Sequence, residues 1–438
     1  MNGATLRHYL AQPVRGVAGE LAVPGDKSIS HRALMLGGIA EGRTEIEGFL
    51  ASEDCLATLS ALRALGVQIE RPGECQVRVF GAGRSGLRPA PDRLDMGNAG
   101  TAMRLFMGLL AGERFDSTLV GDASLMRRPM ERVATPLRAM GAQIQTLEGR
   151  PPVRIRGGAA LHGIDYTMPM ASAQVKSALL LAALSAQGRT SVSEPAPTRD
   201  HTERMLRDFG VAVARDGARI SIEGGASLVG CPVQVPGDFS SAAFFIVAGC
   251  LAASNGLTLR GVGINPTRTG LLDMLRLMGA DIRVEPHAGE GAEPIADIHV
   301  RASALRAIRV PEQLVPLAID EFPVFFIAAA AARGETLVTG AAELRVKESD
   351  RLVVMAAGLK AVGIECELLN DGLRIQGGQI RGGRVDSHGD HRIAMAFAIA
   401  SVVAQQNIEI DDVANVATSF PGFPALARSV GLALQDAA

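Results

Sequence analysis

The sequence repeats one pattern six times, and each copy closes on the same short phrase. The phrase combines an apolar helix end, a glycine and an alternating strand, and it occurs at residues 62–70, 137–145, 206–214, 275–283, 359–367 and 427–435. The glycines are Gly66, Gly141, Gly210, Gly279, Gly363 and Gly431. Glycine suits the left-handed conformation in which many helices end. A period of roughly 70 residues predicts one supersecondary unit per repeat.

Each repeat also opens on a recognisable turn, which precedes an apolar stretch of helical length. The opening phrases lie at residues 24–32, 96–104, 169–177, 236–244, 319–326 and 387–395. Small, polar or proline residues favour a helix start there, because the first backbone N–H groups have no partner inside the helix. We therefore expect each repeat to present an electropositive helix N-terminus.

The tripeptide Pro-Gly-Asp occurs at residues 24–26 and again at 236–238, so the second half of the chain restarts like the first. Six repeats divided at that point give two groups of three. We predict an α/β fold with one domain at residues 21–236. The other domain would contain residues 1–20 and 237–438, so that a strand near the N-terminus completes it.

Composition restricts the class of protein. The 438 residues are 47% hydrophobic and carry a formal net charge of −2, which gives no reason to expect a nucleic acid or a membrane surface as partner. Five scattered cysteines favour reduced core residues, and no apolar signal segment opens the chain. The histidines form no HxxxH pair and no Walker motif is present. GAGRSG at residues 81–86 has the GxGxxG spacing but does not resemble a nucleotide-binding motif. We expect a cytoplasmic enzyme without metal or cofactor.

Lysine is rare in this chain, and three of the four lysines lie in or beside the turn phrases. Only Lys27, Lys176, Lys347 and Lys360 are lysines among 44 basic residues, which leaves 44 − 4 = 40 arginines. A compact, titratable ammonium suits sites where a planar guanidinium does not. Chance is the alternative explanation for this distribution.

Two segments suggest acid–base chemistry beside an anion. Lys347 and Arg351 are four residues apart with Glu348 between them, a like-charge spacing that destabilises a helix by about 0.2–0.5 kcal/mol unless an anion lies nearby. Asp320 directly precedes a very apolar run, at a position that is cationic in other repeats. A carboxylate there is a candidate base. Helix capping and solvated charges remain the alternative interpretations of all these positions.

Seven motifs together resemble the 5-enolpyruvylshikimate-3-phosphate synthases, in particular their second bacterial class. They are PGDKSISHR at residues 24–32, GNAGTAMR at 97–104, SAQVKSALLLA at 172–182, RDHTE at 199–203, NPTR at 265–268, RVKESDR at 345–351 and DHRIAMAF at 390–397. The resemblance spans the chain. It implies an inside-out α/β barrel of two domains, each with three βαβαββ repeats, and an active site in the cleft between the domains.

The resemblance also implies substrates and site residues. Shikimate 3-phosphate would contact Lys27, Ser28, Arg32, Ser172, Ala173, Gln174, Arg199, Asp320 and Lys347. Phosphoenolpyruvate would contact Lys27, Asn98, Gly100, Arg128, Gln174, Arg351 and Arg392. Asp320 would accept the proton of the attacking 5-hydroxyl and Glu348 would protonate the methylene carbon, with Lys27 as a further catalytic group. The enzyme would act as a monomer.

At two positions the residue in this chain differs from the residue that some members of the family carry. The first class has a lysine before a TFP segment near the C-terminus, whereas this chain has Thr418 there. Some herbicide-insensitive members of the second class have alanine at the position of Gly100. We therefore expect glyphosate to inhibit this enzyme and Gly100→Ala to relieve the inhibition.

Two rival functions lie in related folds. A UDP-N-acetylglucosamine enolpyruvyl transferase would normally carry a cysteine in the loop that here reads GDASLMRRP, at residues 121–129. A binding module built like the RNA 3′-phosphate cyclases would show a basic surface. The balanced charge and the SAQ and KESDR phrases favour the shikimate-type enzyme.

Overall fold

A computed structural model describes residues 8–288, 291 and 293–437. The chain divides into two compact units. Unit 1 contains residues 1–24, 236–289 and 294–438, and unit 2 contains residues 25–235 and 290–293. In the sequence analysis, the predicted domain boundaries follow residues 20 and 236.

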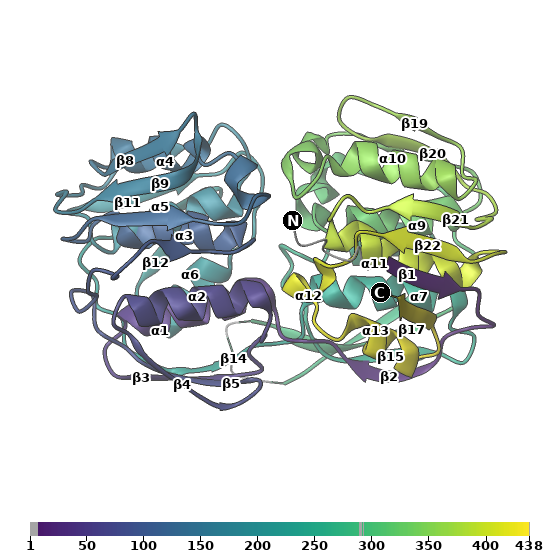
Figure 1. The fold of residues 1–438 in the computed structure, drawn as a ribbon, viewed down its shortest axis with the longest axis horizontal. Helices are drawn as coiled ribbons and strands as arrows, with labels where there is room; N and C mark the ends of the chain where they lie inside the picture. The colour runs from purple at the N-terminus through teal and green to yellow at the C-terminus, as the bar shows by residue number, and fades with distance from the viewer. Residues whose placement is uncertain (1–7, 289–290, 292, 438) are drawn as a thin grey trace. The chain divides into compact units, whose positions relative to one another are not determined.

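Unit 2 contains three sheets of four strands (Figure 1). The first has the order β14 (Pro232–Gln234), β3 (Arg43–Glu47), β5 (Gln76–Phe80) and β4 (Gln68–Gly73). The second has the order β6 (Leu94–Asp95), β7 (Ser117–Val120), β9 (Arg150–Arg156) and β8 (Gln143–Leu147). The third has the order β10 (Asp165–Thr167), β11 (Arg189–Ser193), β13 (Arg219–Glu223) and β12 (Val213–Asp216). In each sheet the first two strands are parallel and the others antiparallel.

Unit 1 repeats this plan with two strands from the start of the chain. One sheet has the order β16 (Asp281–Pro286), β17 (Ile295–Arg301), β15 (Leu257–Gly263) and β2 (Gly19–Ala22). Another has the order β21 (Gly383–Asp386), β22 (Ile408–Asp411), β1 (His8–Gln12) and β23 (Ala433–Ala437). The third has the order β18 (Glu335–Val338), β20 (Leu373–Gln376) and β19 (Cys366–Leu368). An isolated parallel bridge from Arg309 to Leu337 stands where its fourth strand would lie.

Two helices accompany each sheet, with the short α12 as an addition in unit 1, and one helix of each pair is buried on nearly all sides. The helices of unit 2 are α1 (Lys27–Ile39), α2 (Glu53–Ala64), α3 (Gly100–Leu110), α4 (Glu131–Ala139), α5 (Ala173–Ala183) and α6 (His201–Asp208). Those of unit 1 are α7 (Phe239–Ala252), α8 (Gly270–Leu277), α9 (Phe322–Ala331), α10 (Arg351–Ala361), α11 (His391–Ala400), α12 (Val416–Ser419) and α13 (Phe423–Ser429). A helix that is apolar all round is stable only inside a core. Six helices are accordingly buried in the cores of the two units, enclosed by the sheets: α1, α3, α5, α7, α9 and α11 (Figure 1).

The repeated phrases perform the predicted structural tasks. All six closing glycines have positive φ values, from 87° to 103°, and each separates a helix from the next strand. The six opening phrases contain the N-caps of the inner helices, which are Asp26, Ala99, Ser172, Asp238, Glu321 and Asp390. The predicted βαβαββ repeat and the α/β class are therefore confirmed.

Candidate active site

The first turns of the inner helices carry the candidate residues. In α1 every residue from Ile29 to Ile39 is buried, so Lys27 and Ser28 alone reach the surface. In α11 every residue except Arg392 is buried. The same holds in α5, where the residues that are not buried are Ala173 and Gln174. In α1, α5 and α11 the accessible side chains are therefore confined to the first turn.

In unit 2, Arg32 is a buried cation at the centre of a hydroxyl network. Its Nε donates to Thr202 Oγ1 at 2.7 Å and its Nη2 to Ser177 Oγ at 2.9 Å. Its Nη1 donates to the carbonyl of Ser28 at 2.9 Å. Burial lowers the pKa of Arg32 to about 10, while the nearby carboxylates of Glu203 and Asp26 oppose that shift. Arg32 therefore stays charged at neutral pH, and a bound anion would relieve its cost of burial.

Gln174 and Arg128 are each held by a neighbouring polar side chain. Gln174 accepts from Arg104 Nη1 and donates from Nε2 to Thr101 Oγ1 at 2.8 Å. Arg128 Nη2 donates to Asn98 Oδ1 at 2.6 Å. These contacts fix both side chains before any ligand arrives, which is the preorganisation that charge stabilisation requires.

Gly100 lies against Arg128 at the start of α3. A Cβ atom added at position 100 would lie 2.8 Å from Arg128 Nη1. The glycine therefore leaves room for the guanidinium.

Lys27 and Ser172 lie at the starts of the inner helices α1 and α5. Lys27 Nζ lies 2.9 Å from Asp54 Oδ2, and its side chain is 18% exposed. Ser172 caps α5 by accepting from the backbone N–H of Val175 at 3.4 Å. Arg199 is partly buried and directly precedes Asp200, the N-cap of α6. Unit 2 thus brings Lys27, Arg32 and Arg128 to helix starts that favour anions.

In unit 1, Arg351 binds three carboxylates. Its Nη2 lies 2.6 Å from Glu348 Oε2, its Nη1 3.4 Å from Asp320 Oδ1, and its Nε 2.8 Å from Asp390 Oδ2. Burial lowers the pKa of Arg351, but these carboxylates outweigh burial and hold the pKa above its usual value. A permanent cation therefore stands between the two carboxylates that the sequence analysis selected for proton transfer.

Lys347 and Arg392 complete this cluster. Lys347 Nζ lies 3.4 Å from Asp320 Oδ1, and Arg392 Nη1 donates to the backbone carbonyl of Asp320 at 3.1 Å. Asp320, Glu348 and Lys347 stay partly exposed, with 13%, 22% and 21% of their side-chain surface accessible. The cluster offers carboxylates and cations together to a ligand.

Comparison with known proteins identifies the family. The family model for EPSP synthase (3-phosphoshikimate 1-carboxyvinyltransferase) matches residues 11–426. The chain belongs to the EPSP synthase family. The 3-phosphoshikimate 1-carboxyvinyltransferase of Methylococcus capsulatus is 59% identical over 428 residues, 98% of each chain. That of Alkalilimnicola ehrlichii is 60% identical over 428 residues, 97% of this chain and 96% of its own. The structure of EPSP synthase from Acinetobacter baumannii matches with a TM-score of 0.89 and 53% identity, and covers 99% of this chain and 100% of its own.

This EPSP synthase family member also contains site groups that the sequence analysis missed. Asp390 is fully buried and holds Arg351, and Thr202 is the partner of Arg32. The motifs DHR and RDHTE contained both residues, but only their three-dimensional contacts reveal the role. Thr418, noted as a departure within the family, is buried and donates to the carbonyl of Asn415 at 2.7 Å.

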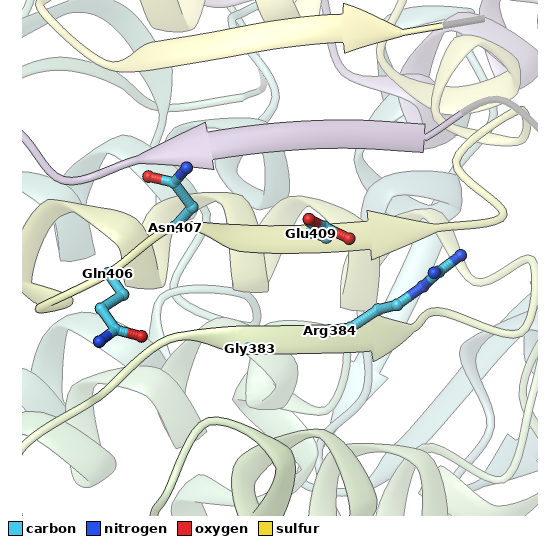
Figure 2. A pocket seen from close by; sticks show the side chains of 5 residues that line it. All are labelled: Gly383, Arg384, Gln406, Asn407 and Glu409. Atoms are coloured by element: carbon cyan, nitrogen blue, oxygen red, sulfur yellow. The ribbon is translucent and has the colours of Figure 1, made fainter.

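A surface hollow on unit 1 lies apart from the candidate residues of this EPSP synthase family member. Gly383, Arg384, Gln406, Asn407 and Glu409 line it, around the start of β21 and β22 (Figure 2). None of these residues belongs to the motifs of the family. A substitution in this hollow can therefore serve as a control for substitutions among the candidate residues.

The described part of this EPSP synthase family member lacks two kinds of feature. Residues 8–288, 291 and 293–437 contain no group of three or more His, Cys, Asp or Glu side chains arranged to hold a metal ion. No helix in those ranges combines the length and the apolar character needed to cross a membrane.

Proposed function

We propose that the chain transfers the 1-carboxyvinyl group of phosphoenolpyruvate to the 5-hydroxyl of shikimate 3-phosphate and releases phosphate. This is the reaction of 3-phosphoshikimate 1-carboxyvinyltransferases in aromatic biosynthesis. The observation that carries the proposal is the unit 1 cluster, in which Arg351 bridges Asp320 and Glu348 with Lys347 beside them. Addition to an enol ether needs a base, an acid and cations for the charges of two substrates, and this cluster supplies all three.

The proposed mechanism is addition followed by elimination. Asp320 accepts the proton of the 5-hydroxyl while the hydroxyl oxygen bonds to C2 of phosphoenolpyruvate, and Glu348 gives a proton to the C3 methylene. The resulting tetrahedral intermediate then returns a proton from C3 to the Glu348 carboxylate as its bond to the phosphate oxygen breaks, and phosphate leaves. Arg351 is positively charged and lies within ion-pair distance of both carboxyl groups. It therefore stabilises Asp320 as the carboxylate that accepts the hydroxyl proton, and Glu348 as the carboxylate that remains once its proton has gone to C3.

The other assignments follow the placement of charge. We assign the carboxylate of phosphoenolpyruvate to Arg351 and Arg392, and its phosphate to Lys27 and Arg128, with Asn98, Gly100 and Gln174 around it. We assign shikimate 3-phosphate to Lys27, Ser28, Arg32, Ser172, Ala173, Gln174, Arg199, Asp320 and Lys347. The buried charge of Arg32 and the helix start at Ser172 support the phosphate contact, since both favour an anion.

Phosphate release tests the function directly. Purified protein should release phosphate only when phosphoenolpyruvate and shikimate 3-phosphate are both present. Replacement of shikimate 3-phosphate by UDP-N-acetylglucosamine should abolish the release. No release with the shikimate pair would refute the function.

Two variants test the assigned acid and base. Loss of a general acid or base typically costs about 10²–10⁴-fold in rate, so Glu348→Gln and Asp320→Ala should each lower kcat within that range. Glu409→Gln, on the exposed hollow of Figure 2, is the matched control and should keep full activity. Full activity in Glu348→Gln or Asp320→Ala would overturn the assignment of roles.

We also propose that the enzyme is cytoplasmic, acts as a monomer and is inhibited by glyphosate. Its five cysteines are all free, which suits a reducing compartment. Gly100 leaves space beside Arg128, which supports binding of a compact inhibitor in place of phosphoenolpyruvate. Sedimentation of the purified chain tests the monomer, and inhibition by glyphosate at fixed substrate tests the binding of the inhibitor.

A further inference from the structure

Lys176 has no role in the function proposed above, yet it is one of only four lysines in the chain. It lies on α5, two residues after Gln174, and its side chain is fully buried. We propose that Lys176 is a positioning residue that fixes the backbone at Arg199, and this proposal rests on the proposed contact between Arg199 and shikimate 3-phosphate.

Three acceptors surround the ammonium group of Lys176. Its Nζ lies 3.0 Å from Glu194 Oε2, 2.6 Å from Glu203 Oε1 and 3.4 Å from the carbonyl oxygen of Thr198. The side chains of Glu194 and Glu203 are 1% and 3% exposed. Two of the three N–H donors of the ammonium thus have hydrogen-bond acceptors, Glu194 and Thr198, and Glu203 adds an ion pair.

The contacts of Lys176 converge on the residue that precedes Arg199. Glu194 Oε2 accepts from the backbone N–H of Thr198 at 3.2 Å and from its Oγ1 at 2.7 Å. The carbonyl that Lys176 binds belongs to the peptide bond between Thr198 and Arg199. Because a peptide bond is planar, holding this carbonyl also fixes the direction in which the chain enters Arg199.

Charge balance explains why this buried cluster is tolerated. Arg215 Nη2 lies 3.3 Å from Glu194 Oε1, so the four side chains comprise two cations and two carboxylates. A guanidinium in place of Lys176 would need space for a planar fork, whereas the compact ammonium fits between three acceptors. This accounts for a lysine in a chain that otherwise uses arginine.

The same helix also connects to Arg32. Ser177, next to Lys176, accepts from Arg32 Nη2 at 2.9 Å and from Thr202 Oγ1 at 2.8 Å. Adjacent residues of α5 therefore hold two cations of unit 2, Arg32 through a side chain and Arg199 through its backbone.

A charge-neutral double variant separates positioning from charge balance. Lys176→Met/Glu203→Met removes one cation and one carboxylate, and it leaves the pair of Glu194 and Arg215 and the contacts of Glu194 to Thr198. We expect the KM for shikimate 3-phosphate to rise about tenfold, near the lower end of what the loss of one charge-assisted hydrogen bond costs in affinity. The KM for phosphoenolpyruvate should change less than twofold. Lys360→Met, at an exposed position of α10, is the matched control and should leave both constants unchanged.

A double-mutant cycle with Arg199→Ala provides the decisive readout. If Lys176 acts through Arg199, the double variant should add no further loss of shikimate 3-phosphate affinity in the Arg199→Ala background. An equal loss in both backgrounds would show general loosening and would overturn the proposal. An unchanged KM in the double variant would overturn it as well.

Hydrogen exchange of residues 194–200 distinguishes failure of this inference from failure of the proposed function. Exchange at the amides of Thr198 and Arg199 should accelerate in the double variant whether or not the wild type is active. A wild type that releases no phosphate, with exchange accelerated in the variant, refutes the function and leaves the backbone role in place. An active wild type whose variant shows unchanged exchange refutes the role of Lys176.

Discussion

Asp390→Asn should weaken both the stability of unit 1 and the binding of phosphoenolpyruvate. Asp390 is fully buried and accepts from Arg351 Nε at 2.8 Å, from Ser349 Oγ at 3.1 Å and from the backbone N–H of Arg392 at 3.0 Å. Asparagine caps a helix about as well as aspartate, so the start of α11 should survive. The charged contact to Arg351 is lost, and the carboxylates of Glu348 and Asp320 remain its only partners among the ion pairs described here.

The expected magnitude follows from these contacts. A hydrogen bond to a charged group contributes about 1.5–3 kcal/mol, so we expect a loss of about 2 kcal/mol. For a unit of about 200 residues this corresponds to a decrease in Tm of about 4–8 °C. If the same energy is lost from the binding of phosphoenolpyruvate, kcat/KM falls about 30-fold.

Differential scanning calorimetry and initial rates at varied phosphoenolpyruvate measure the two effects. Asp386→Asn changes an exposed carboxylate just before the same helix, and it should alter neither quantity. A Tm within 1 °C of wild type together with an unchanged kcat/KM would refute the reasoning. A difference of 1 °C corresponds to about 0.3 kcal/mol, which we take as the resolution of the measurement. Arg351 would then not depend on Asp390 for its position.

Three further predictions test other parts of the structure. Gly100→Ala places a methyl group 2.8 Å from Arg128 Nη1. The KM for phosphoenolpyruvate should therefore rise, and the inhibition constant for glyphosate should rise more. An unchanged inhibition constant for glyphosate would contradict this prediction. Burial raises the pKa of Glu113 from 4.5 to about 7, so the stability this group contributes is fully present below pH 4.5 and is lost as the pH rises through 7. Glu113→Gln should therefore unfold at a higher temperature than wild type at pH 8 but not at pH 4.5, and equal differences at both pH values would contradict this. Glu321→Gln removes a buried charge 3.9 Å from Arg268 and should cost about 1–3 kcal/mol in urea unfolding; a midpoint equal to that of wild type would count against this network.

The repeat and its helix boundaries could be predicted because they depend on local sequence. The closing glycines adopt positive φ values, and the opening phrases contain the N-caps of the inner helices. Both features require only a few consecutive residues with a fixed backbone preference. Lys27 and Arg392 are assigned to the site through the resemblance to the EPSP synthase family, because they lie in the motifs PGDKSISHR and DHRIAMAF.

The partners that hold these residues could not be predicted, because they lie far away along the chain. Thr202 is 170 residues from Arg32, and Asp390 is 39 residues from Arg351. A buried hydroxyl or carboxylate looks the same in sequence whether it binds a cation or caps a helix. Glu321 shows this ambiguity, since it is the N-cap residue of α9, but its side chain makes no cap and instead accepts from Ser240 Oγ.

Because the inner helices are enclosed, the accessible residues in which the six repeats differ indicate the residues that bind substrates or transfer protons. A helix buried all round tolerates charge where its first turn reaches solvent or where buried partners compensate the charge, as at Lys176, since an unpaired buried charge is costly. In α1 and α11 these positions hold Lys27 and Arg392, whereas before α9 the corresponding group is the carboxylate of Asp320. In α7 the first turn is itself buried, and Arg268 binds its Ser240 at 2.6 Å. Six helix starts with one backbone design therefore differ where their side chains are accessible, and a substitution there should change substrate affinity more than stability.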